Sequence, residues 1–224
     1  MSRLLDLGRR VELHSMDPHH QDISIALYRT EQNPPEYRAH SYSELPGAQQ
    51  RVVDVVDGIC RLGGLQPGQG GPTCLCFDCG QDHLLAMKRA FLESCKLPEP
   101  GSATPCDLNI VDRKSGLTIQ ARGLGDGQYR IEATDEAGNP PEDADNGARR
   151  VGVIVNGLRK LGDMLAVEDA DGQLLNDCVS FACGHDHDLL VGLLLPRAIN
   201  VRQSLREQEQ SASKGVLAAP SQQE

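Results

Sequence analysis

Two spacings of hydrophobic residues alternate along this chain, and the same succession of spacings occurs twice. Residues 22–30 (DISIALYRT) and 36–42 (EYRAHSY) alternate apolar and polar side chains, as half-buried strands do. Residues 49–62 repeat their apolar side chains at helical spacing instead. A short apolar strand, TCLCFDC, and a second helical stretch, DHLLAMKRAFLESC, follow. The pattern predicts a hairpin, an amphipathic helix, a strand and a final helix, which is the order ββαβα.

The same order is predicted again after residue 107. LTIQARG and QYRIEATD alternate as strands and are joined by Gly-Asp-Gly, a strong hairpin signal. Residues 149–161 have helical spacing, and the strand DCVSFAC and the helix DHDLLVGLLL follow. Pro196 is expected to end or bend this last helix. Gly63, Gly64 and Gly162 stand where the C-caps of the two amphipathic helices belong.

Direct sequence matches accompany this repeated order. VVDGICRLG (residues 55–63) matches IVNGLRKLG (154–162), and CLCFDCGQDH (74–83) matches CVSFACGHDH (178–187). Each half also places Tyr-Arg in a predicted strand. A duplicated unit with two pseudo-symmetric halves explains why these three matches follow one another in the same order in both halves. The predicted organisation is an N-terminal segment, a first repeat, a Pro-rich linker, a second repeat and a disordered polar tail, at residues 1–21, 22–97, 98–107, 108–202 and 203–224.

The predicted fold class is α/β, more narrowly α+β, because each hairpin precedes the helix that covers it. The element order resembles that of the duplicated halves of imidazoleglycerol-phosphate dehydratase, and of ribosomal protein S5 domain 2-like folds generally. That dehydratase family carries a paired-His and Glu metal motif after the third strand. Cys79-Gly80 and Cys183-Gly184 occupy the corresponding positions here. The resemblance therefore implies a fold and does not extend to the activity.

The acidic composition narrows the classes of partner. A net charge of -10 repels nucleic-acid phosphate and anionic lipid, so neither is an expected partner. The N-terminus lacks the apolar run of a signal peptide, and a small helix is expected around Leu4, Leu5 and Leu7. These features predict a cytoplasmic protein in which all eight cysteines are reduced thiols.

The doubled Cys-Gly-x-Asp-His motif can be explained largely by folding. Asp82 and Asp186 precede apolar helical runs, where an aspartate caps the helix N-terminus. Gly80 and Gly184 supply the backbone freedom of a sharp strand-to-helix corner, and buried cysteines pack as small hydrophobic residues. Neither capping nor packing requires the histidine that ends each motif.

A metal site within one repeat is one reading of the motif. The first copy offers Cys74, Cys76, Cys79 and His83, and the second offers Cys178, Cys183, His185 and His187. Side chains alternate between the faces of a strand, so Cys74 and Cys79 should lie on opposite faces. They could share an ion only if the strand ended early.

A joint site between the repeats is the sharper hypothesis. If a pseudo-twofold axis brings the two corners together, their thiol, imidazole and carboxylate groups can converge on one transition-metal ion, most readily Zn²⁺. The candidate ligands are Cys79, Asp82, His83, Cys183, His185, Asp186 and His187.

The predicted function is a binding or assembly module that holds a protein partner or a second copy and that can bind metal at the two corners. A metal-dependent enzyme acting on a small molecule between the repeats is the first alternative. The second is thiol chemistry at Cys79 or Cys183, because a helix N-terminus and a nearby histidine can activate a thiol.

Overall fold

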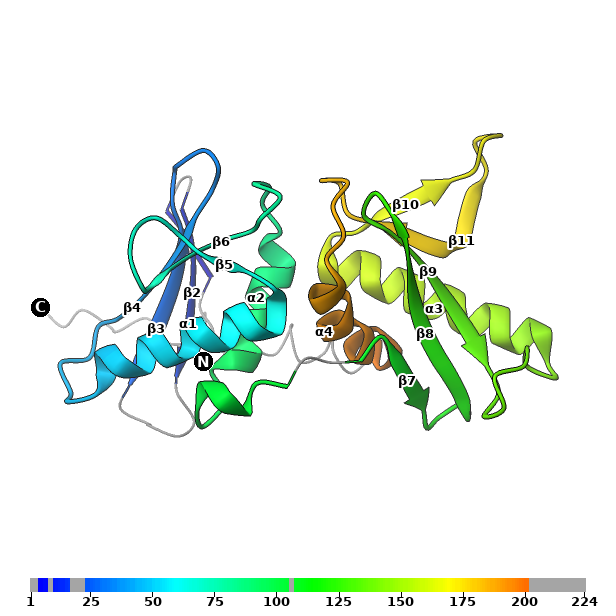
Figure 1. Ribbon diagram of the computed structural model, residues 1–224, viewed down its shortest axis with the longest axis horizontal. Helices are drawn as coiled ribbons and strands as arrows, with labels where there is room; N and C mark the ends of the chain where they lie inside the picture. The colour runs from blue at the N-terminus through cyan, green and yellow to red at the C-terminus, as the bar shows by residue number, and fades with distance from the viewer. Residues whose placement is uncertain (1–3, 8–9, 17–22, 105–106, 202–224) are drawn as a thin grey trace, which may run out of the picture.

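The computed structural model describes residues 4–7, 10–16, 23–104 and 107–201, whose elements form two antiparallel sheets and four α-helices. Each half of the chain contributes one sheet and two helices. Figure 1 shows the two sheets toward opposite ends of the long axis, with helices between them. The structure is therefore a mixed α+β fold.

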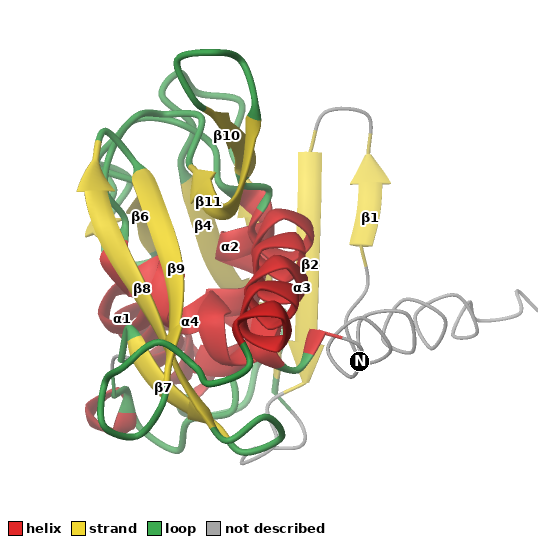
Figure 2. Cartoon of the chain, turned by 90° about the vertical axis from the view of Figure 1, so that its right-hand side faces the viewer, coloured by secondary structure: helices red, strands yellow, loops and turns green. Residues whose placement is uncertain are grey.

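The first half forms a sheet with the strand order β1-β2-β3-β4-β6-β5, in which all neighbours are antiparallel. In Figure 2, β1 and β2 continue this sheet beyond the region of the helices. Its elements are β1 (Leu4–Leu7), β2 (Arg10–Met16), β3 (Ser24–Arg29), β4 (Tyr37–Ser41), α1 (Ala48–Gly63), β5 (Gln66–Pro67), β6 (Cys74–Cys76) and α2 (Leu84–Ser94).

The second half forms a sheet with the strand order β10-β11-β9-β8-β7, also antiparallel throughout. A short 3₁₀ helix, Pro100–Ser102, precedes it in the Pro-rich connection. Its elements are β7 (Asn109–Asp112), β8 (Leu117–Gly125), β9 (Gln128–Thr134), α3 (Ala144–Gly162), β10 (Leu165–Glu168), β11 (Leu174–Ser180) and α4 (Asp188–Ile199).

Both predicted hairpins are confirmed by the pairing of β3 with β4 and of β8 with β9. In the second hairpin, Asp126 and Gly127 both have positive φ angles, 53° and 73°. That combination is required by a type I′ turn, whose twist matches that of the flanking strands. The Gly-Asp-Gly signal therefore identified the position of this turn from local sequence.

Four details of the prediction are wrong. The residues around Leu4 form strands β1 and β2 instead of a helix. Each half has one more strand after its first helix, β5 or β10. The second half also begins with the unpredicted strand β7, so the observed orders are ββββαββα and βββαββα. Helix α3 begins at Ala144, because the side chain of Asp143 accepts a hydrogen bond from the backbone of Asn146 and caps it earlier than the apolar spacing suggests. Of the two expectations for Pro196, that it ends or bends the last helix, the first does not hold, because Pro196 lies inside α4, which continues to Ile199. The predicted polar tail, residues 203–224, lies outside the described residues.

The matching glycines of α1 and α3 mark the points where the second helix of each half comes close. A Cβ atom at Gly157 would lie 3.0 Å from both the Cα and the Cβ of Ala198 on α4. A Cβ atom at Gly58 would meet the Ser94 side chain on α2, whose hydroxyl donates to the carbonyl of Val55. Only glycine permits this separation, so the repeated Gly reflects repeated helix packing.

A matching arginine fixes the far end of each second helix. Arg51 of α1 donates to the carbonyl oxygens of Cys95 and Leu97 after α2. Arg150 of α3 donates to the carbonyl of Ile199 at the end of α4, and its Nε lies 2.6 Å from the carboxylate of Asp112. These carbonyls have no partner inside their helices, so the arginines replace hydrogen bonds lost at the helix ends.

The two halves share one hydrophobic core. Helix α2 packs against α4, and α1 also contacts α4, so a single cluster of buried side chains extends through both halves. The first residues of α2 and α4 follow the two Cys-Gly-x-Asp-His corners. This packing determines that the two corners lie close together. None of the helices in the described part of the chain combines the length and the hydropathy that a membrane span requires.

Replacement of Gly157 by alanine is expected to lower the free energy of unfolding by about 1–3 kcal/mol, because the new methyl group overlaps backbone atoms of Ala198. Gly152 on the same helix is the matched control, since a Cβ there meets nothing within 4 Å. Its replacement by alanine should raise stability by about 0.5–1 kcal/mol. Chemical denaturation of both variants measures the difference, and equal effects would contradict the close helix contact.

Candidate metal centre

Each Cys-Gly-x-Asp-His corner is a tight turn between the last strand and the last helix of its half. The backbone N–H of Gly80 donates to the carbonyl of Phe77 at 3.0 Å, and Gly184 donates to Phe181 at 3.2 Å. The two glycines have φ angles of 67° and 70°, a conformation that L-residues rarely adopt. Each turn directs the preceding cysteine back toward the start of the following helix.

The histidine of each corner is the N-cap residue of its helix. The carbonyl of His83 accepts the first helical hydrogen bond of α2, from Met87, and the carbonyl of His187 accepts that of α4, from Val191. Neither imidazole makes a capping hydrogen bond. Both rings are therefore free to turn toward the cysteines.

Four side chains, two from each corner, meet between the halves. The Sγ atom of Cys79 lies 3.2 Å from Nε2 of His83, and Cys183 Sγ lies 3.2 Å from Nε2 of His187. One potential ligand atom from each of the four residues lies within 4.8 Å of the others, so the group can hold a metal ion. A tetrahedral Zn²⁺ site places sulfur and nitrogen ligands about 3.3–3.8 Å apart. The largest separation in the group exceeds that range by about 1 Å.

Two phenylalanines pack around the imidazoles. The rings of His83 and His187 have centroids 4.7 Å apart. Phe77 lies edge-to-face 4.9 Å from His83, and Phe181 lies 4.9 Å from His187 and 5.2 Å from His83. Both phenylalanines are 3% exposed. Aromatic rings therefore exclude water from one side of the four ligands and fix the planes of both imidazoles.

Backbone N–H groups point at both sulfur atoms. The N–H of Gln81 donates to Cys79 Sγ at 3.5 Å, and the N–H of His185 donates to Cys183 Sγ at 3.4 Å. These N–H groups orient both sulfur atoms, and the thiolate is the form of cysteine that binds metal.

The protonation of the centre also suits a metal. Burial, together with the nearby His187, lowers the pKa of His83 to about 4. Burial and the neighbouring His185 lower the pKa of His187 as well. Both imidazoles are therefore neutral near pH 7 and have a lone pair available for a cation. Burial, with a contribution from Cys183, raises the pKa of Cys79, so a metal must displace a proton from that thiol.

The other candidate ligands point elsewhere. Asp82 accepts a hydrogen bond from the hydroxyl of Tyr37 and forms an ion pair with Arg29 at 2.7 Å. Asp186 accepts from the backbone N–H of Gly127 at 3.0 Å. His185 is exposed, and its Nδ1 lies 2.9 Å from the carbonyl oxygen of its neighbour Cys183. The two aspartates connect their corners to other elements, and all three residues lie outside the group of four.

The prediction that Asp82 and Asp186 are helix N-caps is wrong, because the histidines occupy the cap positions. Each aspartate stands directly before its histidine, so the sequence alone does not distinguish which of the two residues is the cap. The structure instead uses each aspartate to connect the corner to the first hairpin of its half.

Two buried tyrosines support the corners, and the sequence analysis gave them no role. Tyr129 accepts a hydrogen bond from the N–H of His187 at 2.6 Å and donates to Asp188 at 2.9 Å. Burial and the bond to Asp188 raise the pKa of Tyr129, so its hydroxyl keeps its proton. Tyr37 lies in the matching position and donates to Asp82. The Tyr-Arg pair that occurs in both halves was a signal for these tyrosines. The groups to which their hydroxyls bond are, however, distant in sequence.

Cys74 and Cys178 do not take part in the centre. Both are buried and lie in the strands, opposite Arg38 and Arg130 of the neighbouring strands. The Nε of Arg38 donates to Cys74 Sγ at 3.2 Å. Strand β6 ends at Cys76, so the alternation of faces does not extend to Cys79. The four sulfur and nitrogen atoms come from both halves, and the within-repeat set is not assembled among the described residues.

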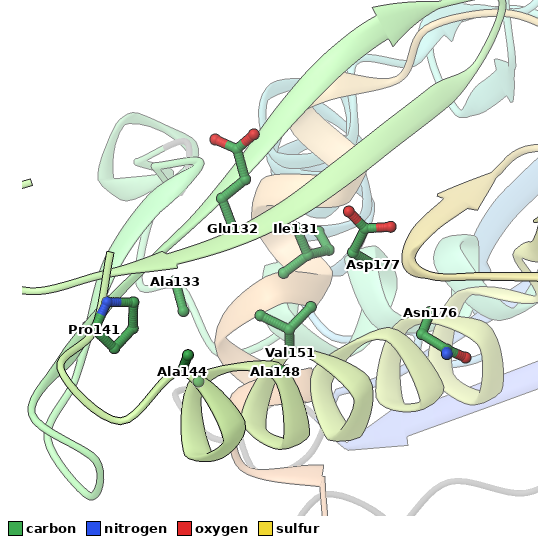
Figure 3. A pocket seen from close by; sticks show the side chains of 10 residues that line it. Ile131, Glu132, Ala133, Pro141, Ala144, Ala148, Val151, Asn176 and Asp177 are labelled. Atoms are coloured by element: carbon green, nitrogen blue, oxygen red, sulfur yellow. The ribbon is translucent and has the colours of Figure 1, made fainter. Parts of the chain in front are cut away.

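A separate groove of about 370 Å³ lies in the second half, between β9, β11 and α3. Figure 3 shows Ile131 and Val151 facing each other across it, with Glu132 and Asp177 at its edge. Asp177 is paired with Arg130. The lining residues include neither cysteine nor histidine, so this groove lacks the thiol and imidazole groups of the four-residue centre.

Comparison of the chain with protein-family models, with curated proteins and with solved structures finds no match. The similarity in element order to S5 domain 2-like folds therefore stays a prediction.

Acidification is expected to destabilise the metal-free protein. His83 has a pKa near 4 when folded but an ordinary pKa near 6.5 when unfolded, so between these values the unfolded chain binds the proton more readily. The free energy of unfolding should be at its full value above pH 7 and fall by on the order of 2 kcal/mol toward pH 4. Urea denaturation in the presence of a chelator measures this decline. The His83→Phe variant should show a smaller decline, and an equal one would contradict the assignment.

Replacement of Tyr129 by phenylalanine should lower the free energy of unfolding by about 1–3 kcal/mol, because the N–H of His187 and the carboxylate of Asp188 both lose a partner. Tyr42 is the control. Tyr42 is 63% exposed, so water can hydrogen-bond to any group that loses its hydroxyl as a partner. Tyr42→Phe should therefore change stability by less than about 0.5 kcal/mol. Thermal and chemical denaturation compare the two variants.

Proposed function

We propose that this protein binds one Zn²⁺ ion per chain with Cys79, His83, Cys183 and His187, and that the ion acts as a structural clasp between the two halves of a binding or assembly module. The observation that carries the proposal is the convergence of four potential ligand atoms within 4.8 Å, two from each half. Two thiolates and two imidazoles are a ligand set that Zn²⁺ prefers.

The number of ligands favours a structural role over a catalytic one. Catalytic zinc sites generally have three protein ligands and leave a position open for water or substrate, whereas structural sites are closed by four. Here four potential ligand atoms are available, which is the number that closes a structural site. Phe77 and Phe181 cover one side of the imidazoles. Both features support a closed site.

The similarity of the two halves further supports a duplicated origin, in which each copy supplies one Cys-x3-His half-site. The glycines Gly58 and Gly157, the arginines Arg51 and Arg150, and the two tyrosines have matching roles in the two halves. A half-site with two ligands binds zinc weakly, while two half-sites on adjacent helices complete a site. Metal binding then stabilises the arrangement of the halves, because only the folded chain presents all four ligands.

A protein partner or a second copy is the proposed target of this module. The net charge of -10 opposes binding to nucleic acid or anionic lipid. A metal that fixes the relative position of two α/β halves would also fix the surface that they present jointly.

Elemental analysis of the purified protein is expected to give one zinc ion per chain, and removal of the ion with a strong chelator should lower the melting temperature by several degrees. Cys183→Ser and His187→Ala should reduce the zinc content to well below one ion per chain. Cys76→Ser and His185→Ala are matched controls that remove a thiol and an imidazole outside the group of four. If the ligand variants retained the ion, or if the metal-free chain failed to bind added Zn²⁺, the proposal would be wrong.

A further inference from the structure

We infer that the centre is redox-sensitive: a peroxide converts Cys79 and Cys183 into a disulfide between the two halves, and the bound Zn²⁺ is released. The inference rests on the proposed zinc site and assigns a mode of regulation to it. Its basis is that the two sulfur atoms lie in one group whose members are within 4.8 Å, although one comes from each half of the chain.

The position of the two cysteines permits the sulfur atoms to meet. A disulfide requires a sulfur–sulfur distance of about 2.05 Å, so the two atoms must approach by less than about 3 Å. Both cysteines lie in turns beyond the ends of β6 and β11 and before the first residues of α2 and α4. A turn can shift by this amount without breaking a sheet or a helix, whereas a cysteine inside a strand cannot.

The accessibility of the two thiols fits the chemistry. Cys79 and Cys183 are only half-buried, so a small oxidant can reach them. In the zinc-loaded protein both sulfur atoms are thiolate ligands, and the N–H groups of Gln81 and His185 donate to them. By contrast, Cys74 and Cys178 are completely buried among the strands. Accessible thiolates next to a second thiol are the cysteines that oxidise selectively.

The oxidation takes place in two balanced steps. One thiolate sulfur attacks an oxygen of hydrogen peroxide, the S–O bond forms as the O–O bond breaks, and the departing hydroxide takes up a proton to become water. The second thiolate then attacks this sulfenic sulfur, the S–S bond forms as the S–O bond breaks, and a second hydroxide leaves as water after protonation. The two thiolates lose two electrons in total, and the peroxide gains them with two protons.

Disulfide formation changes the ligand set and keeps the halves joined. Both sulfur ligands are consumed, so the two imidazoles of His83 and His187 remain, and two neutral nitrogen ligands hold Zn²⁺ far less tightly than the full set. The covalent bond then links the two corners that the ion had linked. The predicted consequence is release of zinc without separation of the halves.

The test uses the full-length, zinc-loaded protein and hydrogen peroxide. Released Zn²⁺ is followed with a chromogenic chelator, and the protein is then digested without reduction by a protease that cleaves before aspartate. This digestion frees residues 78–81, in which Cys79 is the sole thiol, and residues 177–185, which contain Cys183. The expected result is one zinc ion released per disulfide, with these two peptides cross-linked through Cys79 and Cys183, and recovery of zinc binding after reduction.

The controls separate this inference from the proposed function. Cys76→Ser removes a half-buried thiol outside the group and should leave zinc release and the disulfide unchanged. Cys183→Ala should abolish the cross-link and leave Cys79 oxidised to sulfinic acid. Retention of zinc under peroxide, or release with sulfinic acid in place of the disulfide in the unaltered protein, would overturn the inference while the zinc clasp stands. A chain that contains and binds no zinc before oxidation would overturn both.

Discussion

The contact between α2 and α4 determines where the chemistry of this protein lies. Each helix begins directly after a Cys-Gly-x-Asp-His corner, and the apolar faces of the two helices belong to the core that the halves share. Burial of those faces brings the two corners together. Two half-sites that could each hold a metal only weakly thus become one group of four ligand atoms. The hydrophobic core positions the polar centre, and the centre in turn can stabilise the core.

The helix contacts of the two halves show how a repeated sequence can encode a repeated geometry without identical partners. Gly58 faces Ser94, whose hydroxyl bonds to the α1 backbone, while Gly157 faces Ala198. The requirement at both positions is a missing Cβ, because a methyl group would overlap the Ser94 side chain at Gly58 and backbone atoms of Ala198 at Gly157. The partner residue can vary as long as it stays small. The same tolerance applies to Asp82 and Asp188, which accept the tyrosine hydroxyls from different positions in the two corners.

The buried surroundings of the ligands connect folding and metal chemistry. Phe77 and Phe181 are core residues by burial, yet they also fix the imidazole planes and remove water from one side of the centre. That burial lowers the pKa of His83, so the imidazole is ready to bind a cation without first losing a proton. It also raises the pKa of Cys79, and a metal is the natural means of stabilising that thiolate. The same environment therefore removes competition from protons at the imidazole of His83, while the thiol of Cys79 has to release a proton when a metal binds.

The sequence by itself determined the elements whose signals are local. Alternation predicted the hairpins, the Gly-Asp-Gly signal located the turn of one of them, and helical spacing located α1 and most of α3. The doubled motif also directed attention to His83 and His187, because no folding requirement explained an imidazole there. The short strands β5 and β10 and the early start of α3 were missed, since two- to four-residue strands and a single capping aspartate give almost no periodic signal. Only the tertiary structure decided which groups face the centre. Whether a corner presents its aspartate or its cysteine depends on partners such as Tyr37 and Gly127, which lie about 45 and 60 residues away and are brought close by sheet pairing and helix packing.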